Sequence, residues 1–163
     1  MFRKQEQRVG DAMGIREEMP LLARHEGKWH GTYTVIDREG NVIDRHRSVL
    51  NCTFPADGSV PYHQTNHYHW DDGREEHIEF PAAYADGKLV FDTERIDGVC
   101  WEVDDHCIVL HWVYKADRSV SLYELIHLDD TSSNRTRTWH WLKDGICFQR
   151  TIIDEKKVSG PGA

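Results

Sequence analysis

Residues 106–127 read HCIVLHWVYKADRSVSLYELIH, two runs of branched and aromatic side chains separated by four residues. Runs of this composition predict β-strands. A link as short as residues 115–118 cannot cross over between parallel strands, so the two strands are expected to pair as an antiparallel hairpin. The same pattern of strand-like runs separated by short links recurs on both sides of this stretch. It divides the chain into about ten predicted strands: 29–37, 42–54, 61–70, 75–80, 88–93, 98–103, 106–114, 119–127, 135–143 and 146–154.

The links between these runs carry residues that favour tight turns. Arg38–Asn41, Asp71–Gly73, Ala85–Gly87 and Lys143–Gly145 all contain Gly, Asn or Asp, which tolerate positive φ or cap turns. A meander of about ten antiparallel strands is longer than an open twisted sheet supports, and closure removes its exposed edges. We therefore expect an all-β fold, a closed antiparallel up-and-down barrel of about ten strands with a short N-terminal helix. A β-sandwich is the alternative.

The two ends of the chain differ from this β-rich body. Residues 1–14 hold few apolar side chains and are expected to form a flexible arm. Residues 15–25 have helical apolar spacing, interrupted at Pro20, which predicts a short helix that plugs one end of the barrel. The single barrel domain is then expected to cover residues 15–157, and residues 158–163 to form a disordered tail.

Composition limits the partners and cofactors. A length of 163 residues fits one domain, and a net charge of −8 argues against a nucleic-acid partner. The sequence shows neither an apolar run long enough to span a membrane nor an export signal, so we expect a cytoplasmic protein with four reduced cysteines. It also lacks a P-loop and a Gly-x-Gly-x-x-Gly motif, which argues against a nucleotide cofactor, and we expect no other cofactor.

Two charged residues interrupt otherwise apolar faces of predicted strands. Glu124 alternates with apolar residues in the run 119–127, and Arg150 does so in the run 146–154. Because a buried charge is costly unless it is paired, we expect the two residues to face each other inside the barrel. The pair is then either purely structural or ligand-binding, with Arg150 holding an anionic group.

The predicted strand 135–143 has two contrasting faces. We assign the face of Thr136, Thr138, His140 and Leu142 to the cavity, and the face of Arg135, Arg137, Trp139 and Trp141 to the outside as a cation–π ladder. An inward His140 beside Glu124 would act as a general acid–base. The alternative is a core or surface histidine without a catalytic role.

Aromatic side chains dominate the remaining inward faces. Trp29, expected to plug the barrel end, shares a face with Tyr33, and Trp112 shares one with Tyr114. Such density is either ordinary core or the lining of a cavity for a planar or hydrophobic ligand. In the second case the ligand-binding residues are Arg150, Trp29, Trp112 and Phe148, and the catalytic residues are Glu124, His140, Tyr33 and Tyr114.

The run PYHQTNHYHW at residues 61–70 is rich in histidine. His67 and His69 share one face with Cα atoms about 7 Å apart. His77 follows on the next predicted strand, where Glu75 or Glu79 could complete a histidine–carboxylate set. A haem- or metal-binding barrel that uses these histidines is therefore an alternative function. The other interpretation is a solvated or cavity-lining polar face, and the sequence leaves open which face of this strand points inward.

The stretch EGKWHGTY at residues 26–33, followed by the turn DREGNV at residues 37–42, resembles the opening of calycin-type barrels. These comprise the lipocalin-like, fatty-acid-binding-like and phycobiliprotein-lyase-like families. The Gly-x-Trp-x-Gly-x-Tyr pattern is especially similar to that of an uncharacterised bacterial family related to the phycobiliprotein lyases. The resemblance implies that a tryptophan in the first strand closes one barrel end behind a short N-terminal helix.

The end of the sequence is similar to the last hairpin of the same family, from TWHW at residues 138–141 through KDG at residues 143–145 to RTI at residues 150–152. In fatty-acid-binding-like members an inward arginine of the final strand holds a ligand carboxylate, and Arg150 resembles it in position. The sequence departs from the family's Arg-x-Tyr motif, because Ile152 stands where that motif has tyrosine.

Together these features predict a barrel whose cavity binds a small hydrophobic or aromatic ligand with an anionic group. The protein then either carries the ligand or turns it over without a cofactor, as a lyase, isomerase or cyclase. The haem or metal barrel and a structural partner protein are the alternatives. The sequence does not set the oligomeric state, for which a homodimer is the candidate.

Overall fold

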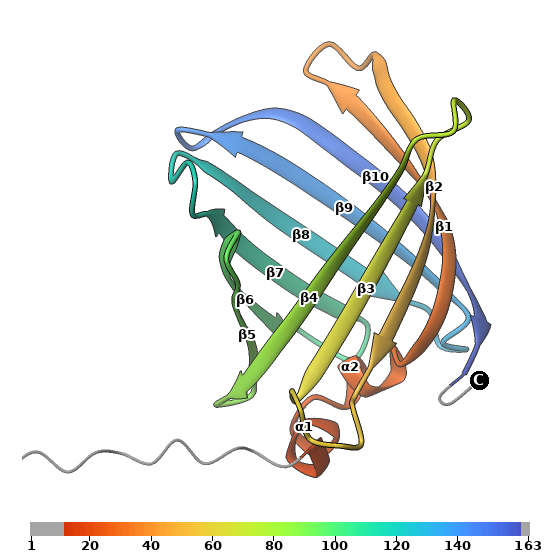
Figure 1. Ribbon diagram of the computed structural model, residues 1–163, viewed down its shortest axis with the longest axis vertical. Helices are drawn as coiled ribbons and strands as arrows, with labels where there is room; N and C mark the ends of the chain where they lie inside the picture. The colour runs from red at the N-terminus through yellow and green to blue at the C-terminus, as the bar shows by residue number, and fades with distance from the viewer. Residues whose placement is uncertain (1–11, 161–163) are drawn as a thin grey trace, which may run out of the picture.

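The computed structural model describes residues 12–160, and its ten strands form one closed barrel (Figure 1). The strands are β1 (Gly27–Asp37), β2 (Val42–Thr53), β3 (Tyr62–His69), β4 (Glu75–Ala85), β5 (Lys88–Asp92), β6 (Ile96–Glu102), β7 (Cys107–Tyr114), β8 (Val120–Leu128), β9 (Asn134–Lys143) and β10 (Ile146–Ser159). Each strand pairs antiparallel with its neighbours in sequence, and β1 closes the barrel against β10. The predicted up-and-down barrel is confirmed, and the sandwich alternative is wrong.

Two hairpins show how the turn residues set the strand pairing. Asp86 and Gly87 have φ of 50° and 72°, and Asp144 and Gly145 have φ of 50° and 76°. Positive φ at both central residues gives the two-residue turn whose twist matches that of the flanking strands. The residues on either side of each turn are directly paired.

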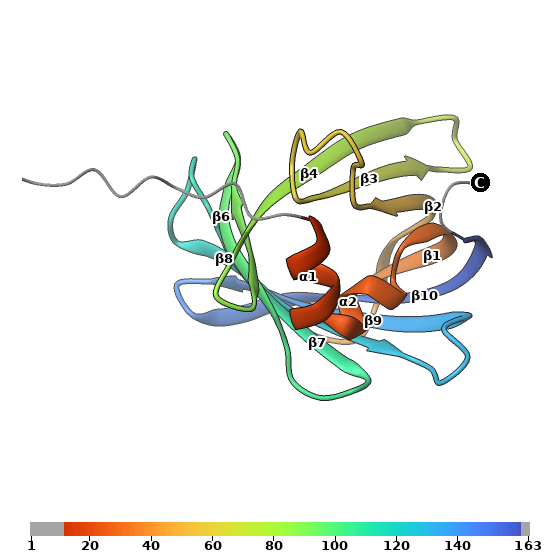
Figure 2. The same ribbon diagram turned by 90° about the horizontal axis from the view of Figure 1, so that it is seen from below.

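Two short helices close one end of the barrel (Figure 2). They are α1 (Ala12–Glu18) and α2 (Pro20–Arg24), and they are separated at Met19 because Pro20 cannot continue the first helix. Trp29 is fully buried at this end, so the predicted plug is confirmed. Within residues 12–160 no helix has the length and apolar character needed to cross a membrane.

The ends of several elements differ from the predicted ones. Helix α1 begins at Ala12, inside the predicted arm, β4 extends to Ala85, and β10 extends to Ser159, beyond the predicted end of the domain. The rest of the predicted arm and tail, residues 1–11 and 161–163, lies outside the described residues.

The predicted faces are correct for β8 and wrong for β9. Glu124 points into the barrel on β8, where its side chain is buried. On β9 the arginines Arg135 and Arg137 and the ring of Trp139 are buried inside the barrel, and His140 is exposed on the outside. The prediction assumed that charged side chains lie outside. Carboxylates on the two neighbouring strands pair with the arginines, so here the charged face is the buried one.

The predicted face of β10 is also wrong. Thr151, Ile153 and Glu155 are buried, whereas Arg150 is exposed and Phe148 is 38% exposed. Apolar alternation identifies the inward face only where the interior is apolar, and this part of the interior is polar. Arg150 therefore does not face the barrel interior, where the resemblance implies that it holds a ligand.

Candidate functional site

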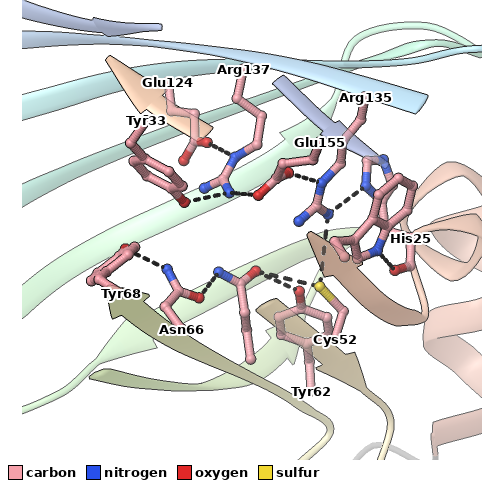
Figure 3. A network of polar contacts seen from close by, with 12 residues as sticks. His25, Tyr33, Cys52, Tyr62, Asn66, Tyr68, Glu124, Arg135, Arg137 and Glu155 are labelled. Carbon is pink, nitrogen blue, oxygen red and sulfur yellow. Dashed lines mark hydrogen bonds and ion pairs between the residues drawn. The ribbon is translucent and has the colours of Figure 1, made fainter. Parts of the chain in front are cut away.

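Two arginines and two glutamates lie buried together inside the barrel (Figure 3). Arg137 donates from Nε to Glu124 Oε1 and from Nη1 to Glu155 Oε1, the latter at 3.1 Å, and Arg135 donates from Nε to Glu155 Oε2. Each of the four side chains is at most 4% exposed. The positive and negative charges cancel, so their joint burial costs much less than the burial of any one of them alone.

Strand register brings these four charges together. Arg135 and Arg137 alternate on β9, Glu155 lies directly opposite Arg135 on β10, and Glu124 lies diagonally from Arg137 on β8. Gly31 on β1 leaves the space that the side chain of Glu155 fills, because a Cβ at position 31 would lie 2.4 Å from Glu155 Cγ. The second glycine of the Gly-x-Trp-x-Gly-x-Tyr pattern is thus required by close packing rather than by a turn.

Tyr33 connects the buried charges to the other half of the barrel. Arg137 Nη1 donates to the Tyr33 hydroxyl at 3.0 Å, and burial raises the pKa of Tyr33 well above its ordinary value. Burial alone would also raise the pKa of Glu155, but the charges of Arg135 and Arg137 lower it. At neutral pH Glu155 is therefore ionised, and Tyr33 keeps a proton that it can donate.

A second row of polar side chains follows the inner face of β3. Tyr62 donates to Gln64 Oε1 at 3.0 Å, Gln64 Nε2 donates to Asn66 Oδ1 at 2.8 Å, and Asn66 Nδ2 donates to the Tyr68 hydroxyl at 2.7 Å (Figure 3). A void of only about 40 Å³ is lined by residues of this row and by the buried charges. We call this row and the four buried charges the polar core. Together with apolar side chains such as Leu89 and Leu110, the polar core fills the half of the barrel near the helices.

His25 belongs to this polar core at the helix end. Its side chain is 2% exposed, its Nδ1 lies 3.1 Å from Arg135 Nη1, and its Nε2 has no hydrogen-bond partner among the described residues. Burial, followed by the nearby positive charges of Arg135 and Arg137, lowers the pKa of His25 well below its ordinary value. The ring is therefore neutral in the folded protein at neutral pH.

The free energy of unfolding is expected to fall as the pH is lowered below 6.5, the ordinary pKa of histidine. His25 then takes up a proton in the unfolded chain but not in the folded one, which contributes up to about 1.4 kcal/mol per pH unit. His25→Asn should remove this contribution, whereas His140→Asn, at an exposed position, should leave it unchanged. Urea titrations between about pH 5 and pH 7 measure the slopes. Equal slopes for wild type and His25→Asn would contradict the assignment.

The half of the barrel away from the helices holds a cavity of about 240 Å³, which we call the aromatic chamber. Its lining residues are Tyr33, Val35, His46, Tyr68, Trp70, Glu76, Ile78, Phe80, Arg95, Trp112, Tyr114, Trp139, Trp141, Gln149 and Thr151. Phe80, Trp112 and Trp139 also line the small void in the polar core, so they form the floor of the chamber.

Two indole N–H groups at this floor have no acceptor at normal hydrogen-bond geometry. Trp112 Nε1 and Trp139 Nε1 are buried and make no such bond within residues 12–160. The Tyr114 hydroxyl is near the Trp112 indole: burial raises the pKa of Tyr114, and this contact offsets part of the rise. Buried donors are paired in the great majority of cases, and an unpaired one calls for an explanation such as a ligand. By contrast, Trp141 Nε1 donates to Thr151 Oγ1 at 3.0 Å.

The histidine of an acid–base pair lines the same chamber. His46 Nδ1 lies 2.7 Å from Asp44 Oδ2, and Trp70 Nε1 donates to Asp44 Oδ1 at 2.9 Å. The His46 ring stacks on Tyr33 with centroids 5.0 Å apart, and its side chain is 9% exposed. A carboxylate that fixes one ring nitrogen in this way leaves the other nitrogen available for proton transfer.

The structure separates the predicted site residues into two groups. Inside the barrel lie Glu124, Tyr33, Trp29, Trp112 and Tyr114; outside it lie His140, Arg150, Phe148, His67, His69 and His77. The predicted pairing of Glu124 with Arg150 is wrong, because Arg137 is the partner of Glu124. Of the inner group, Tyr33, Trp112 and Tyr114 line the chamber, whereas Trp29 closes the other end.

Asp44 and His46 were not predicted as site residues. Asp44 and His46 lie on the same face of β2 as Ser48 and Leu50, because the four residues alternate along the strand. Since Ser48 and Leu50 are buried, this alternation is the sequence feature that could have indicated an inward position for Asp44 and His46. Arg135 and Arg137, which are buried in the site, belong to the face of β9 that the sequence predicts on the outside.

Comparison with known proteins places this fold among established barrels. The model of the domain of unknown function DUF3598, N-terminal, matches residues 16–158. A DUF3598 protein of unknown function from Nostoc punctiforme is similar in structure, with a TM-score of 0.65 and 18% identity over 84% of this chain and 49% of that one. An S-type phycobiliprotein lyase from Guillardia theta is similar with a TM-score of 0.68 and 16% identity over 87% of this chain and 93% of that one. No curated protein matches the sequence significantly.

These relatives share the fold at low sequence identity. The chain spans about half the length of the Nostoc protein. The expected likeness to phycobiliprotein-lyase-like barrels is confirmed at the level of the fold. Since the N-terminal DUF3598 model matches residues 16–158, which is most of the chain, the chain belongs to the DUF3598 family.

Proposed function

We propose that the aromatic chamber binds a planar, conjugated small molecule that carries hydrogen-bond acceptors. The observation that carries this proposal is the pair of buried, unpartnered N–H groups of Trp112 and Trp139 at the chamber floor. An unsatisfied buried donor costs about 1–3 kcal/mol, and a carbonyl or carboxylate of a ligand would offset that cost. The surrounding rings offer the stacking and edge contacts that aromatic ligands prefer.

The volume of the chamber sets the size of the enclosed part of the ligand. A volume of about 240 Å³ is smaller than the roughly 300–1,000 Å³ typical of pockets that enclose a drug-sized molecule. One or two fused rings would be held inside, and the rest of a longer conjugated ligand would extend through the open end. A linear tetrapyrrole is a suitable long test ligand because a phycobiliprotein lyase has the same fold.

An anionic group on the ligand is supported by Arg95 rather than by Arg150. Arg95 lines the chamber and makes no salt bridge with another described residue, whereas Arg150 lies on the outer surface. Glu76 also lines the chamber, so the anionic group would lie on the side of Arg95. Each buried charge of the polar core has an oppositely charged partner. Arg135 Nη2 makes no hydrogen bond with the described residues, but Arg135 lines the small void of about 40 Å³ rather than the chamber.

Filling the chamber is expected to block binding. Val35→Trp places an indole in the cavity and should weaken the binding of 2-naphthoate and of biliverdin at least tenfold, because the ring occupies the space that the ligand needs. Val90→Trp, on the outer surface where Val90 is 37% exposed, is the matched control and should bind like wild type. Tryptophan fluorescence quenching measures the dissociation constants. Equal affinities for all three proteins would place the binding site outside the chamber.

A second candidate function, proton transfer on the bound ligand, is favoured by the Asp44–His46 pair. His46 would take a proton from one ligand carbon and return it to another, an isomerisation that balances without a cofactor. Ligand incubated with the protein in D₂O should then gain deuterium at carbon, as measured by mass spectrometry, and His46→Gln should bind the ligand without this exchange. Binding without any exchange in the wild type would leave a carrier as the function and exclude this chemistry for that ligand.

A further inference from the structure

The outer face of the β3–β4 hairpin carries a group of side chains that the chamber does not use. Strand alternation on β3 turns His67 and His69 outward and Tyr68 inward. The register of the hairpin places His69 opposite Glu75 and His67 opposite His77. Three imidazoles and a carboxylate therefore meet on one patch of the barrel wall.

The donor atoms of three of these residues converge. His67 Nε2 lies 3.4 Å from Glu75 Oε2, and His69 Nδ1 lies 3.2 Å from Glu75 Oε1. One ligand atom from each residue lies within 4.8 Å of the other two. In a tetrahedral zinc site with bonds of about 2.0–2.1 Å, neighbouring donors are separated by about 3.3 Å. Small rotations of exposed side chains would bring these donors to that geometry.

We propose that His67, His69 and Glu75 bind one divalent transition-metal ion of the zinc class on the outside of the barrel. Two imidazoles and one carboxylate suit zinc, copper or nickel rather than magnesium or calcium, which prefer oxygen ligands. The side chains of His67, His69 and Glu75 are 43%, 30% and 60% exposed, so an ion can reach them from solvent. The fourth position is open to water or to His77, whose ring centroid lies 5.9 Å from that of His67.

Of the residues that the sequence offers beside His67 and His69, Glu75 rather than His77 or Glu79 completes the converging triad. The site is independent of the proposed ligand chamber, since its side chains lie on the opposite face of the barrel wall. An ion here would tie β3 to β4 next to the turn that follows His69.

A second histidine–carboxylate group on the surface provides a matched control. His106 Nε2 lies 2.7 Å from Asp130 Oδ1, and the rings of His106 and His127 stack with centroids 5.8 Å apart. The same residue types are present, but their donor atoms do not converge as a triad among the described residues. If zinc bound only because histidines are present on the surface, removing the histidines of either group would weaken zinc binding by the same factor.

Zinc ion, titrated into the full chain in competition with a chromophoric chelator, tests the proposal. Wild type is expected to bind one equivalent, His67→Ala/His69→Ala to bind at least tenfold more weakly, and His106→Ala/His127→Ala to match wild type. Thermal melts without zinc check that both variants fold. Added zinc should raise the melting temperatures of wild type and of His106→Ala/His127→Ala, but not that of His67→Ala/His69→Ala. Equal zinc affinities for wild type and His67→Ala/His69→Ala, or an equal loss in both double variants, would overturn the proposal.

Discussion

Arg137→Leu is expected to lower the free energy of unfolding by about 3–5 kcal/mol, because it leaves Glu124 as an uncompensated charge inside the barrel. Arg137 is the partner of Glu124 and also contacts Glu155 and the Tyr33 hydroxyl. Glu155 keeps Arg135 as its partner, so the loss is concentrated on one carboxylate. Urea or guanidinium unfolding of wild type and Arg137→Leu measures this change in the free energy of unfolding.

The double variant Glu124→Leu/Arg137→Leu is expected to be more stable than Arg137→Leu alone. It removes both charges of one pair and leaves the pair of Arg135 and Glu155 in place. Apolar replacement of a whole buried pair is often close to neutral. A double variant that is less stable than the single one would contradict the pairing.

An exposed ion pair gives the control for this experiment. Lys143 Nζ lies 2.6 Å from Asp117 Oδ2, with side chains 48% and 52% exposed. Lys143→Leu should change the free energy of unfolding by no more than about 0.5 kcal/mol, since exposed pairs contribute little. If Arg137→Leu is as mild as this control, the buried charges do not hold the barrel together.

The fold could be predicted because its signals are local. Turns such as Asp86-Gly87 and Asp144-Gly145 specify hairpins through the backbone conformations that those residues tolerate. A chain of hairpins leaves few topologies, and closure follows from the number of strands. Trp29 was also placed correctly, because the same short pattern accompanies a barrel plug in the families that the sequence resembles.

The inward faces of β9 and β10 could not be predicted from either strand alone. The burial of Arg135 and Arg137 depends on Glu124 and Glu155, which come from two other strands. Apolar alternation within β9 alone therefore predicts that the face with the two arginines is exposed to solvent. The adjoining strands carry three acidic residues, Glu124, Asp154 and Glu155, so their number alone does not show which of them compensate the two arginines.

The chamber residues illustrate a second limit of sequence-based inference. Trp112 was expected inside the barrel and is found there, but whether its N–H meets an acceptor depends on packing that no sequence pattern encodes. Trp139 was expected on the outer face and is buried inside, and its unpartnered N–H depends on packing in the same way. Asp44 and His46 alternate on a strand whose first half is exposed and whose second half is buried, so periodicity alone does not place them at a cavity.

The most direct test of the chamber's role measures ligand affinity and stability in Trp112→Phe/Trp139→Phe. This variant keeps two aromatic rings and removes both unpartnered N–H groups. The dissociation constant for 2-naphthoate should rise about ten- to a hundredfold, because each lost hydrogen bond contributes about 0.5–1.5 kcal/mol. No hydrogen bond of the described residues is lost, but the smaller rings leave a cavity in the core and are expected to lower the free energy of unfolding. Affinity is therefore compared under conditions where unfolding measurements show that each variant is folded. Trp101→Phe, outside the chamber lining, should leave the dissociation constant unchanged. A double variant that binds the ligand as tightly as wild type would contradict the claim that these indoles hold it.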